Sequence, residues 1–271
     1  MSNSPNPLST ELPWDLVSVA YAREIAPQFE LYARDALRLA GVERGARILD
    51  VACGPGTLAL VAAPEAARVT AVDFSPQMVA RLRERIADSK ATNVDVRLGD
   101  GQSLELADAS FDAAFSMFGL IFFPDRGRGL RELRRVLVPG GRAAIASWTP
   151  LTDVPLFAAV FKVLGEQLPQ LPMGDPSPPL GTHEAIVAEL SEAGFRDVAT
   201  HRVSHAMPFP SPQAFGASLR RTLAPLVLLE HKLGKEAFEP IAAAIDARLT
   251  ELAAPGPGSV TMTALIGIGT A

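Results

Sequence analysis

The sequence predicts a doubly wound α/β fold, in which helices cover both faces of a mainly parallel sheet. Short, almost continuously apolar runs alternate with helical segments along residues 47–148. The first of these runs ends in a glycine-containing loop that leads into a helix, and the second ends in an acidic residue. Uninterrupted apolar strands are typical of parallel sheets, because both faces of such a sheet are buried.

The first forty residues are expected to be helical. Apolar side chains recur there at three- and four-residue spacing, at Leu16, Val19, Ala20, Phe29, Leu31, Leu37 and Leu39. Pro27 is expected to divide this stretch into two helices, and Gly41 supplies the stop. The first strand is expected at 47–52, RILDVA, followed by the glycine loop and a helix, LALVAA, that Pro64 ends.

The middle of the chain repeats this unit of strand and helix. A second strand is expected at 68–75, RVTAVDFS, after which Ser75 provides an N-cap and Pro76 takes the first helical position of PQMVARLRERIAD. An amphipathic helix, RGLRELRRVLVPGG, ends in a Pro-Gly-Gly exit. Three further strands are expected at 94–100 (VDVRLGD), 111–120 (FDAAFSMFGL) and 142–148 (RAAIASW).

The pattern changes after Trp148. Residues 150–181 are rich in Pro, Leu and Phe and include a predicted loop, MGDPSPPLG. Pro225 and Pro240 are expected to break a second helical region. The elements expected here are a helix at 182–195 with Thr182 as its N-cap, a strand at 197–209, helices across 211–253 and a last strand at 259–269.

The composition is that of an ordinary globular protein. Hydrophobic residues make up 48% of the 271 residues, and the formal net charge is −5. A mildly acidic chain is a poor candidate for wrapping nucleic acid, which favours basic patches. The N-terminus has no features of a secretory signal, and the longest strongly apolar run, 113–123, is too short to span a membrane. One cysteine allows neither an internal disulfide nor a multi-cysteine metal site, so we expect a cytoplasmic enzyme or binding protein.

The glycine loop and the acid after the second strand together indicate a nucleoside site. Gly54 and Gly56 let the backbone approach a ligand closely, and the helix that follows offers free N–H groups. Asp73 lies about twenty residues further on, where an acid can hold both ribose hydroxyls of an adenosine. The alternatives are a tight strand-to-helix turn and a helix-capping aspartate, although Ser75 is the better placed cap.

Five segments resemble, in order and spacing, the motifs of class I S-adenosylmethionine-dependent methyltransferases. They are LDVACGPGT, VTAVDFSPQMV, LGDGQSL, FDAAFSMFGLIFFPD and ELRRVLVPGGR. The chain is most similar to the bacterial small-molecule group, which includes quinone-biosynthesis C-methyltransferases. The third glycine position of a nicotinamide fingerprint holds Leu58 or Ala59 instead, which argues against that class.

The resemblance implies a Rossmann-like, mainly parallel, seven-stranded sheet with an added helical lid. It also implies S-adenosyl-L-methionine as the cofactor. The domain organisation that follows is N-terminal lid helices at 1–42, a cofactor-binding core at 43–150, and the last strands with helical insertions near 151–181 and 211–253 within 151–271. We expect the inserted helices to lie over the carboxyl edge of the sheet.

The resemblance also implies roles for individual residues. Asp50 would orient the amino group of the cofactor, Asp73 would accept from the ribose, and Asp100 would accept from the adenine N6 amino group. The other implied contacts are Ala52, Cys53, Gly54, Gly56, Met117 and Phe118 at the methionine end, and Phe74, Met78, Gly101 and Gln102 around the adenine. Cys53 is expected to be a small buried filler rather than a reactive thiol.

Several methyl acceptors are disfavoured by the same comparison. The segment after the fourth strand lacks the Asn- or Asp-Pro-Pro-aromatic run of amino-methylating enzymes of nucleic acids and glutamine, and the glutamate pair of protein-arginine enzymes. One cysteine argues against RNA C5 and arsenite enzymes. Phe122 or Phe123 stands where many relatives carry histidine, which favours an apolar acceptor. The candidate lining residues are Trp14, Phe118, Phe122, Trp148, Phe157, Phe161, Phe209 and Phe215.

Three residues are candidates for a catalytic role. Tyr21 lies where related enzymes often have a tyrosine that closes over the methyl group or the cofactor carboxylate, and a core tyrosine is the alternative. His183 and His205 are candidate bases, although each histidine of the chain is also expected as a surface or capping residue. No metal ion is expected in the site.

The expected activity is methyl transfer to O, N, S or C of a small, largely apolar metabolite by direct in-line displacement. A binding protein without turnover and a nicotinamide oxidoreductase are the alternatives. No nucleic-acid partner and no stable membrane insertion are expected, and the oligomeric state stays open.

Overall fold

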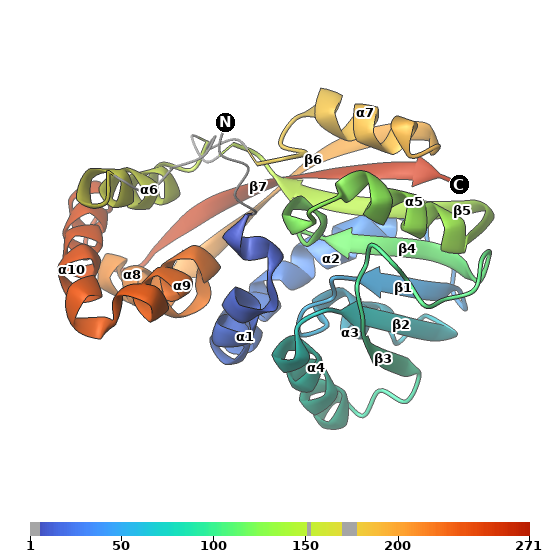
Figure 1. Cartoon of the computed structure of the whole chain (residues 1–271), viewed down its shortest axis with the longest axis horizontal. Helices are drawn as coiled ribbons and strands as arrows, with labels where there is room; N and C mark the ends of the chain where they lie inside the picture. The colour runs from blue at the N-terminus through green and yellow to red at the C-terminus, as the bar shows by residue number, and fades with distance from the viewer. Residues whose placement is uncertain (1–5, 151–152, 170–177) are drawn as a thin grey trace.

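The computed structural model describes residues 6–150, 153–169 and 178–271 (Figure 1). Its centre is one seven-stranded sheet in the order β3-β2-β1-β4-β5-β7-β6. The strands are β1 (Arg47–Val51), β2 (Arg68–Asp73), β3 (Val94–Leu98), β4 (Phe111–Met117), β5 (Leu137–Trp148), β6 (Arg196–Phe209) and β7 (Gly258–Thr270). Strands β1 to β5 pair in parallel, and β7 is antiparallel to both β5 and β6. The predicted mainly parallel, seven-stranded sheet is confirmed.

Helices cover both faces of this sheet. They are α1 (Glu11–Ala20), α2 (Ala26–Ala40), α3 (Thr57–Ala62), α4 (Pro76–Ser89), α5 (Arg126–Val136), α6 (Pro155–Gln167), α7 (His183–Glu192), α8 (Pro212–Thr222), α9 (Ala224–Leu233) and α10 (Lys235–Leu252). Apolar side chains of α2, α3 and α4 share one buried cluster with the sheet. Those of α5 and α7 share another cluster on the opposite face. The arrangement is doubly wound, as the sequence predicts.

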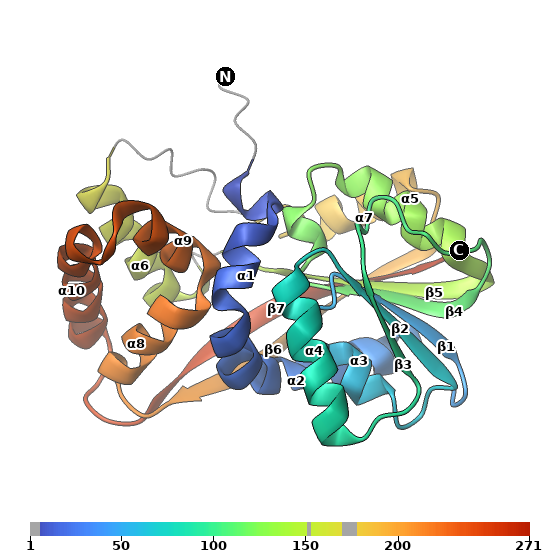
Figure 2. The same cartoon turned by 60° about the horizontal axis from the view of Figure 1, so that its bottom comes forward.

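A second group of helices packs beyond the end of the sheet. The pairing of β6 with β7 continues to Phe209 and Gly258, whereas β5 leaves β7 at the pair Trp148–Ala264. The chain between β6 and β7 forms α8, α9 and α10, which share an apolar core with α6. We call this cluster the lid core and its four helices the lid helices. Figure 2 shows α1 between this helical group and α4. The group lies on the side of the carboxyl ends of the parallel strands (Figure 1).

Local signals place most helix ends where the sequence predicts them. Ser75 caps α4 by accepting a hydrogen bond from the Met78 N–H at 3.1 Å, and Pro76 is the first helical residue. Thr182 caps α7 in the same way, accepting from the Ala185 N–H at 3.2 Å. Two predicted segments lie partly outside the described residues, namely the N-terminal helical region (1–5) and the loop at 173–181 (173–177).

Some predicted breaks and boundaries differ from the structure. Pro240 lies inside α10, and the chain breaks instead at Gly234, whose φ of +81° ends α9. The apolar side chains of α10 around Pro240 are buried in the lid core, and this packing holds the helix together although proline removes one backbone donor. The break between α1 and α2 is a π-helical turn, Tyr21–Ile25, and Pro27 lies in the first turn of α2. Helix α5 ends at Val136, because the Pro-Gly-Gly segment already belongs to β5.

Candidate active site

The site forms where the strand order reverses. β1 and β4 are neighbours in the sheet, yet the chain leaves them toward opposite edges, and ligands of doubly wound sheets bind beyond the carboxyl ends at this point. A cavity of about 50 Å³ lies there. Its walls are Asp50, Ala52, Cys53, Gly54, Pro55, Thr57 and Leu58 around the glycine loop, Met117 and Phe118 after β4, and Tyr21, Phe29 and Ala33 from the N-terminal helices.

The backbone around the cavity is bent in an uncommon way. Ala52 after β1 and Phe118 after β4 both have positive φ angles, of 55° and 64°. Non-glycine residues rarely adopt this conformation, and it concentrates at functional sites. Gly54 has a φ of 54°, and a side chain at Gly56 would overlap Leu82 of α4. Both the left-handed backbone and the contact with Leu82 therefore favour glycine at position 56.

Asp50 is buried at the end of β1. Its side chain is 1% exposed and its Oδ2 accepts a hydrogen bond from the Ala59 N–H at 3.1 Å. Burial, together with the nearby charge of Asp73, raises the pKa of this carboxyl to about 8, although the hydrogen bond from Ala59 lowers it. Without a cationic partner, the group is therefore largely protonated near neutral pH.

Asp73 is the second buried carboxylate, at the end of β2. It accepts the Gly54 N–H at 2.7 Å through Oδ2 and the Ser75 N–H at 2.9 Å through Oδ1. Burial raises its pKa to about 6, although these backbone donors favour the ionised form. Each carboxylate oxygen has a second lone pair. Asp73 can accept two further hydrogen bonds, which is the number that a ribose diol offers.

Helix α1 closes over the loop that carries Asp73. Ser75 donates its hydroxyl proton to Asp15 Oδ1 at 2.5 Å, and the Gln77 N–H donates to the same oxygen at 3.2 Å. Met78, which is 2% exposed, packs in one apolar cluster with Val17 and Tyr21 of the N-terminal segment. Asp15 was not predicted as a functional residue, because nothing local in the sequence distinguishes it from other acids on a helix surface.

The residues predicted around the adenine follow β2 and β3. Asp100 is exposed, and its Oδ1 accepts the Gln102 N–H at 2.9 Å and the Gln102 side-chain amide at 3.1 Å. A side chain at Gly101 would come within 2.6 Å of Phe123 Cζ, so glycine is required there. Phe74 is partly buried between Asp73 and Ser75. These residues lie at the same carboxyl edge of the sheet as the cavity.

Comparison with known proteins identifies the family. A family model described as a methyltransferase domain matches residues 48–141. The ubiquinone/menaquinone biosynthesis C-methyltransferase of Geobacter sulfurreducens is 33% identical over 191 residues, which cover 63% of this chain and 72% of that relative. The demethylmenaquinone methyltransferase of Deinococcus radiodurans is 33% identical over 214 residues, 73% of this chain and 80% of the relative. This chain belongs to the class I S-adenosylmethionine-dependent methyltransferases.

The fold comparison agrees with this membership. Phosphoethanolamine N-methyltransferase 2 of Haemonchus contortus, solved with phosphomonomethylethanolamine and S-adenosylhomocysteine, superposes with a TM-score of 0.60 at 21% identity. The match covers 94% of this chain and 57% of that one. The methyltransferase uses S-adenosylmethionine, and a nicotinamide oxidoreductase is not supported. Within the described residues, no helix has the length and apolar content to cross a bilayer.

The two buried carboxyl groups of the methyltransferase, Asp50 and Asp73, fit this cofactor. Among the described residues, no cationic side chain forms an ion pair with Asp50 or Asp73, although both carboxyls are buried. A ligand that carries an ammonium group and a ribose diol supplies the partners that they lack. In the same described part of the chain, no three His, Cys, Asp or Glu side chains are grouped as metal ligands would be.

Tyr21 is the predicted catalytic residue that lines the cavity of the methyltransferase. It belongs to the π-helical turn between α1 and α2, a type of turn that is frequent at functional sites. Its ring packs edge-on against Phe29, with the ring centres 6.1 Å apart. Burial, and then the charge of Asp73, raise the pKa of Tyr21 above its ordinary value. The phenol is therefore neutral and able to donate a hydrogen bond.

The two candidate histidine bases lie outside the cavity. His205 on β6 pairs its Nε2 with Asp35 Oδ2 at 2.8 Å, and its ring packs edge-on against Tyr32. The Tyr32 ring in turn contacts Phe118, so it lies between His205 and the cavity wall. His183 is exposed at the start of α7, on the other face of the sheet, and bonds to the Thr200 hydroxyl. Their catalytic roles stay predictions.

The aromatic residues predicted for the acceptor pocket fall into separate groups. Phe118 lines the cavity and stacks on Trp148, with ring centres 3.9 Å apart. Phe215 packs against Phe157 and Phe209 beneath the lid helices, and Phe161 joins the lid core. Trp14 packs against Phe122 near the N-terminus. Phe29 was not predicted as a wall of the cavity, because its helical spacing indicates only a buried face.

Proposed function

We propose that this methyltransferase transfers a methyl group to O, N, S or C of a small, largely apolar acceptor. The observation that carries the proposal is the chemistry of the cavity wall that α2 and the end of β4 provide. That wall consists of Phe29, Met117 and Phe118, with the ring of Trp148 stacked behind. Such a surface favours an apolar or aromatic acceptor and excludes water from it.

The proposed task of the chain is to hold two reactants in line. The sulfonium of bound S-adenosylmethionine makes its methyl carbon electrophilic. Asp73 holds the ribose, Asp50 orients the amino group, and Tyr21 closes the pocket beside them. Orientation of two bound reactants can lower a barrier by roughly 7–11 kcal/mol without a protein nucleophile.

The ionisable groups of the cavity support a minor role for general-base catalysis. Burial raises the pKa of Tyr21, Asp50 and Cys53, so all three are largely protonated in the free protein near neutral pH and are not available to accept a proton. The acceptor is then an amine, thiol, ionised phenol or electron-rich carbon that needs little activation. The two relatives named as quinone methyltransferases support including aromatic hydroquinones among the candidates.

Transfer of a labelled methyl group to a panel of acceptors tests the proposal. The panel contains hydroquinones, phenols, thiols and amines, each in an apolar and a charged version, and each is assayed with and without EDTA. We expect product from apolar acceptors, no loss to EDTA, and less than a hundredfold loss in His183→Ala and His205→Ala, the lower bound for a positioned base. Preference for the charged versions would overturn the apolar acceptor. Binding of S-adenosylhomocysteine with no product from any acceptor, including those in a metabolite extract, would favour a binding protein.

A further inference from the structure

The connection between β3 and β4 reaches the adenine side of the site without secondary structure of its own. Residues 99–110 contain no helix or strand, yet they include Asp100 and Gln102. Backbone groups in such a long connection need partners from elsewhere in the molecule. The partners are therefore decisive for where these two side chains lie.

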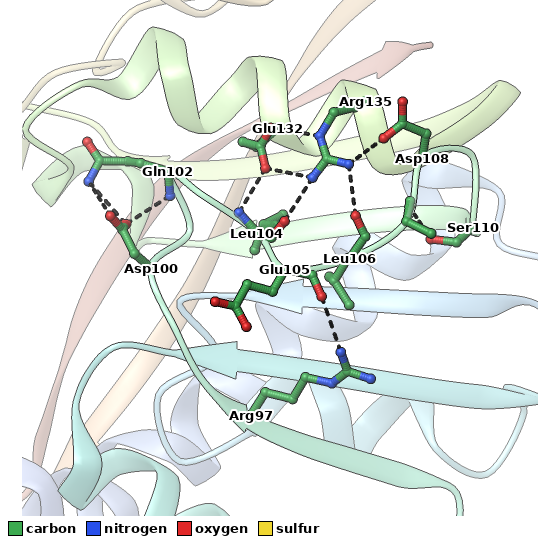
Figure 3. Close-up of polar contacts among 11 residues, drawn as sticks. Arg97, Asp100, Gln102, Leu104, Glu105, Leu106, Asp108, Ser110, Glu132 and Arg135 are labelled. Atoms are coloured by element: carbon green, nitrogen blue, oxygen red, sulfur yellow. Dashed lines mark hydrogen bonds and ion pairs between the residues drawn. The ribbon is translucent and has the colours of Figure 1, made fainter.

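The side chains of two charged residues of α5 bind the backbone in the middle of this connection, as Figure 3 shows. Arg135 donates to the Leu104 carbonyl at 2.9 Å, to the Leu106 carbonyl at 2.8 Å and to Asp108 Oδ1 at 2.5 Å. Glu132 accepts the Leu104 N–H at 2.8 Å through Oε2. We call this pair, Glu132 with Arg135, the α5 clamp.

The two members of the α5 clamp also fix each other. Arg135 donates to both oxygens of Glu132, through Nε at 2.8 Å and Nη2 at 2.7 Å. The bond from Arg135 lowers the pKa of Glu132, and the bond to Glu132 raises that of Arg135, so both stay charged. Charge-assisted bonds from a planar guanidinium define direction as well as distance.

The N-terminal end of α5 also contacts this connection, at Gln102 itself. The Asp125 N–H, at the N-cap of α5, donates to Gln102 Oε1 at 2.9 Å. The Gln102 side chain donates in turn to Asp100 Oδ1 at 3.1 Å. Leu104, which the α5 clamp grips through both its N–H and its carbonyl, is 7% exposed and packs in the same apolar cluster as α5.

We propose that the α5 clamp positions Asp100 and Gln102 to read the adenine base, and so sets the selectivity for an adenine-containing cofactor. Neither clamp residue touches the cofactor; they act through the backbone of residues 104–106. The inference rests on the proposal that Asp100 accepts a hydrogen bond from the adenine N6 amino group.

The test compares two ligands that differ only at the base, S-adenosylhomocysteine and S-inosylhomocysteine. Inosine has a carbonyl in place of the N6 amino group, so it offers Asp100 no proton there. Calorimetry gives the dissociation constant of S-inosylhomocysteine divided by that of S-adenosylhomocysteine, for the wild type and for Arg135→Gln. We expect the ratio to fall about fivefold in the variant, which corresponds to one hydrogen bond. Amide exchange at the Leu104 N–H should speed up in parallel.

A matched pair elsewhere on the sheet supplies the control. Arg47 and Asp112 form a similar forked ion pair, at 2.7 and 3.0 Å, at the amino ends of β1 and β4. Arg47→Gln should leave the ratio unchanged. If Arg135→Gln does not fold, Arg135→Lys gives the same comparison, because lysine keeps the charge but cannot fork.

The outcomes separate the two proposals. Equal weakening of both ligands in the Arg135 variant would show a merely structural role and overturn the inference. A wild type that binds both ligands equally well would overturn the assignment of Asp100, and the inference with it. A reduced ratio in the Arg135 variant alone supports both.

Discussion

At the residue scale, Asp73 joins the glycine loop to the proposed ribose site. We expect Asp73→Ala to weaken S-adenosylhomocysteine binding by about 1–3 kcal/mol, because a buried acceptor for two hydroxyls is lost. Calorimetry on both proteins measures the change. Asp112→Ala, which removes an exposed carboxylate at the other end of the sheet, serves as the control. An unchanged dissociation constant in Asp73→Ala would refute the ribose assignment.

The raised pKa of Asp50 predicts proton release on cofactor binding. The carboxyl has a pKa of about 8 in the free protein, and an ammonium group of the ligand beside it would lower that value. The complex then binds fewer protons than the free protein, so affinity should rise with pH from about 6 to about 8. Calorimetry at neutral pH in two buffers of different ionisation enthalpy measures the release. Asp50→Asn should reduce it, and equal release in that variant would contradict the assignment.

At the scale of elements, α1 is fastened to the loop between β2 and α4 through Asp15. Asp15→Ala removes the acceptor of both the Ser75 hydroxyl and the Gln77 N–H. We expect S-adenosylhomocysteine to dissociate at least about fivefold faster, since two hydrogen bonds that hold α1 over the loop are lost and each contributes about 1 kcal/mol. Stopped-flow fluorescence measures the rate. Asp15→Asn keeps an acceptor and should dissociate at close to the wild-type rate, and Glu11→Ala, on the exposed side of α1, should leave the rate unchanged. A wild-type rate in Asp15→Ala would mean that α1 does not retain the cofactor.

The elements themselves were largely predictable because their signals are local. Ser75 with Pro76 and Thr182 start helices through bonds that span only three residues. The uninterrupted apolar strands identify the sheet as parallel and buried. The prediction of a break at Pro240 was wrong because proline removes only one helical bond, and burial of the neighbouring side chains of α10 outweighs that loss.

At the scale of the whole molecule, two apolar cores serve two proposed tasks. The clusters on the sheet support the cofactor site, and the lid core of α6, α8, α9 and α10 supports the acceptor side. Leu226 in α9 is fully buried in the lid core. We expect Leu226→Ala to lower kcat/KM for the acceptor at least tenfold and to change the Kd for S-adenosylhomocysteine less than twofold.

Leu190→Ala is the matched control for this division of tasks. Leu190 is equally buried, in α7 against the sheet, and its truncation should cost a similar 2–5 kcal/mol of local packing. Thermal denaturation reports the loss of stability in both variants, and methyl-transfer assays report the rates. Equal effects of the two truncations on kcat/KM would refute a special role of the lid.

The sequence by itself determined the fold class, the glycine loop, the acids at the ends of β1 and β2, and the family. Each of these depends on apolar periodicity, capping or motif spacing within a short stretch of chain. Only the tertiary structure decided which side chains surround the cavity. His205 is held by Asp35, Tyr32 donates its hydroxyl to the Met262 carbonyl, and Arg135 grips Leu104. Such contacts join segments that are far apart in the chain, and they depend on how the helices pack on the sheet, which no local pattern encodes.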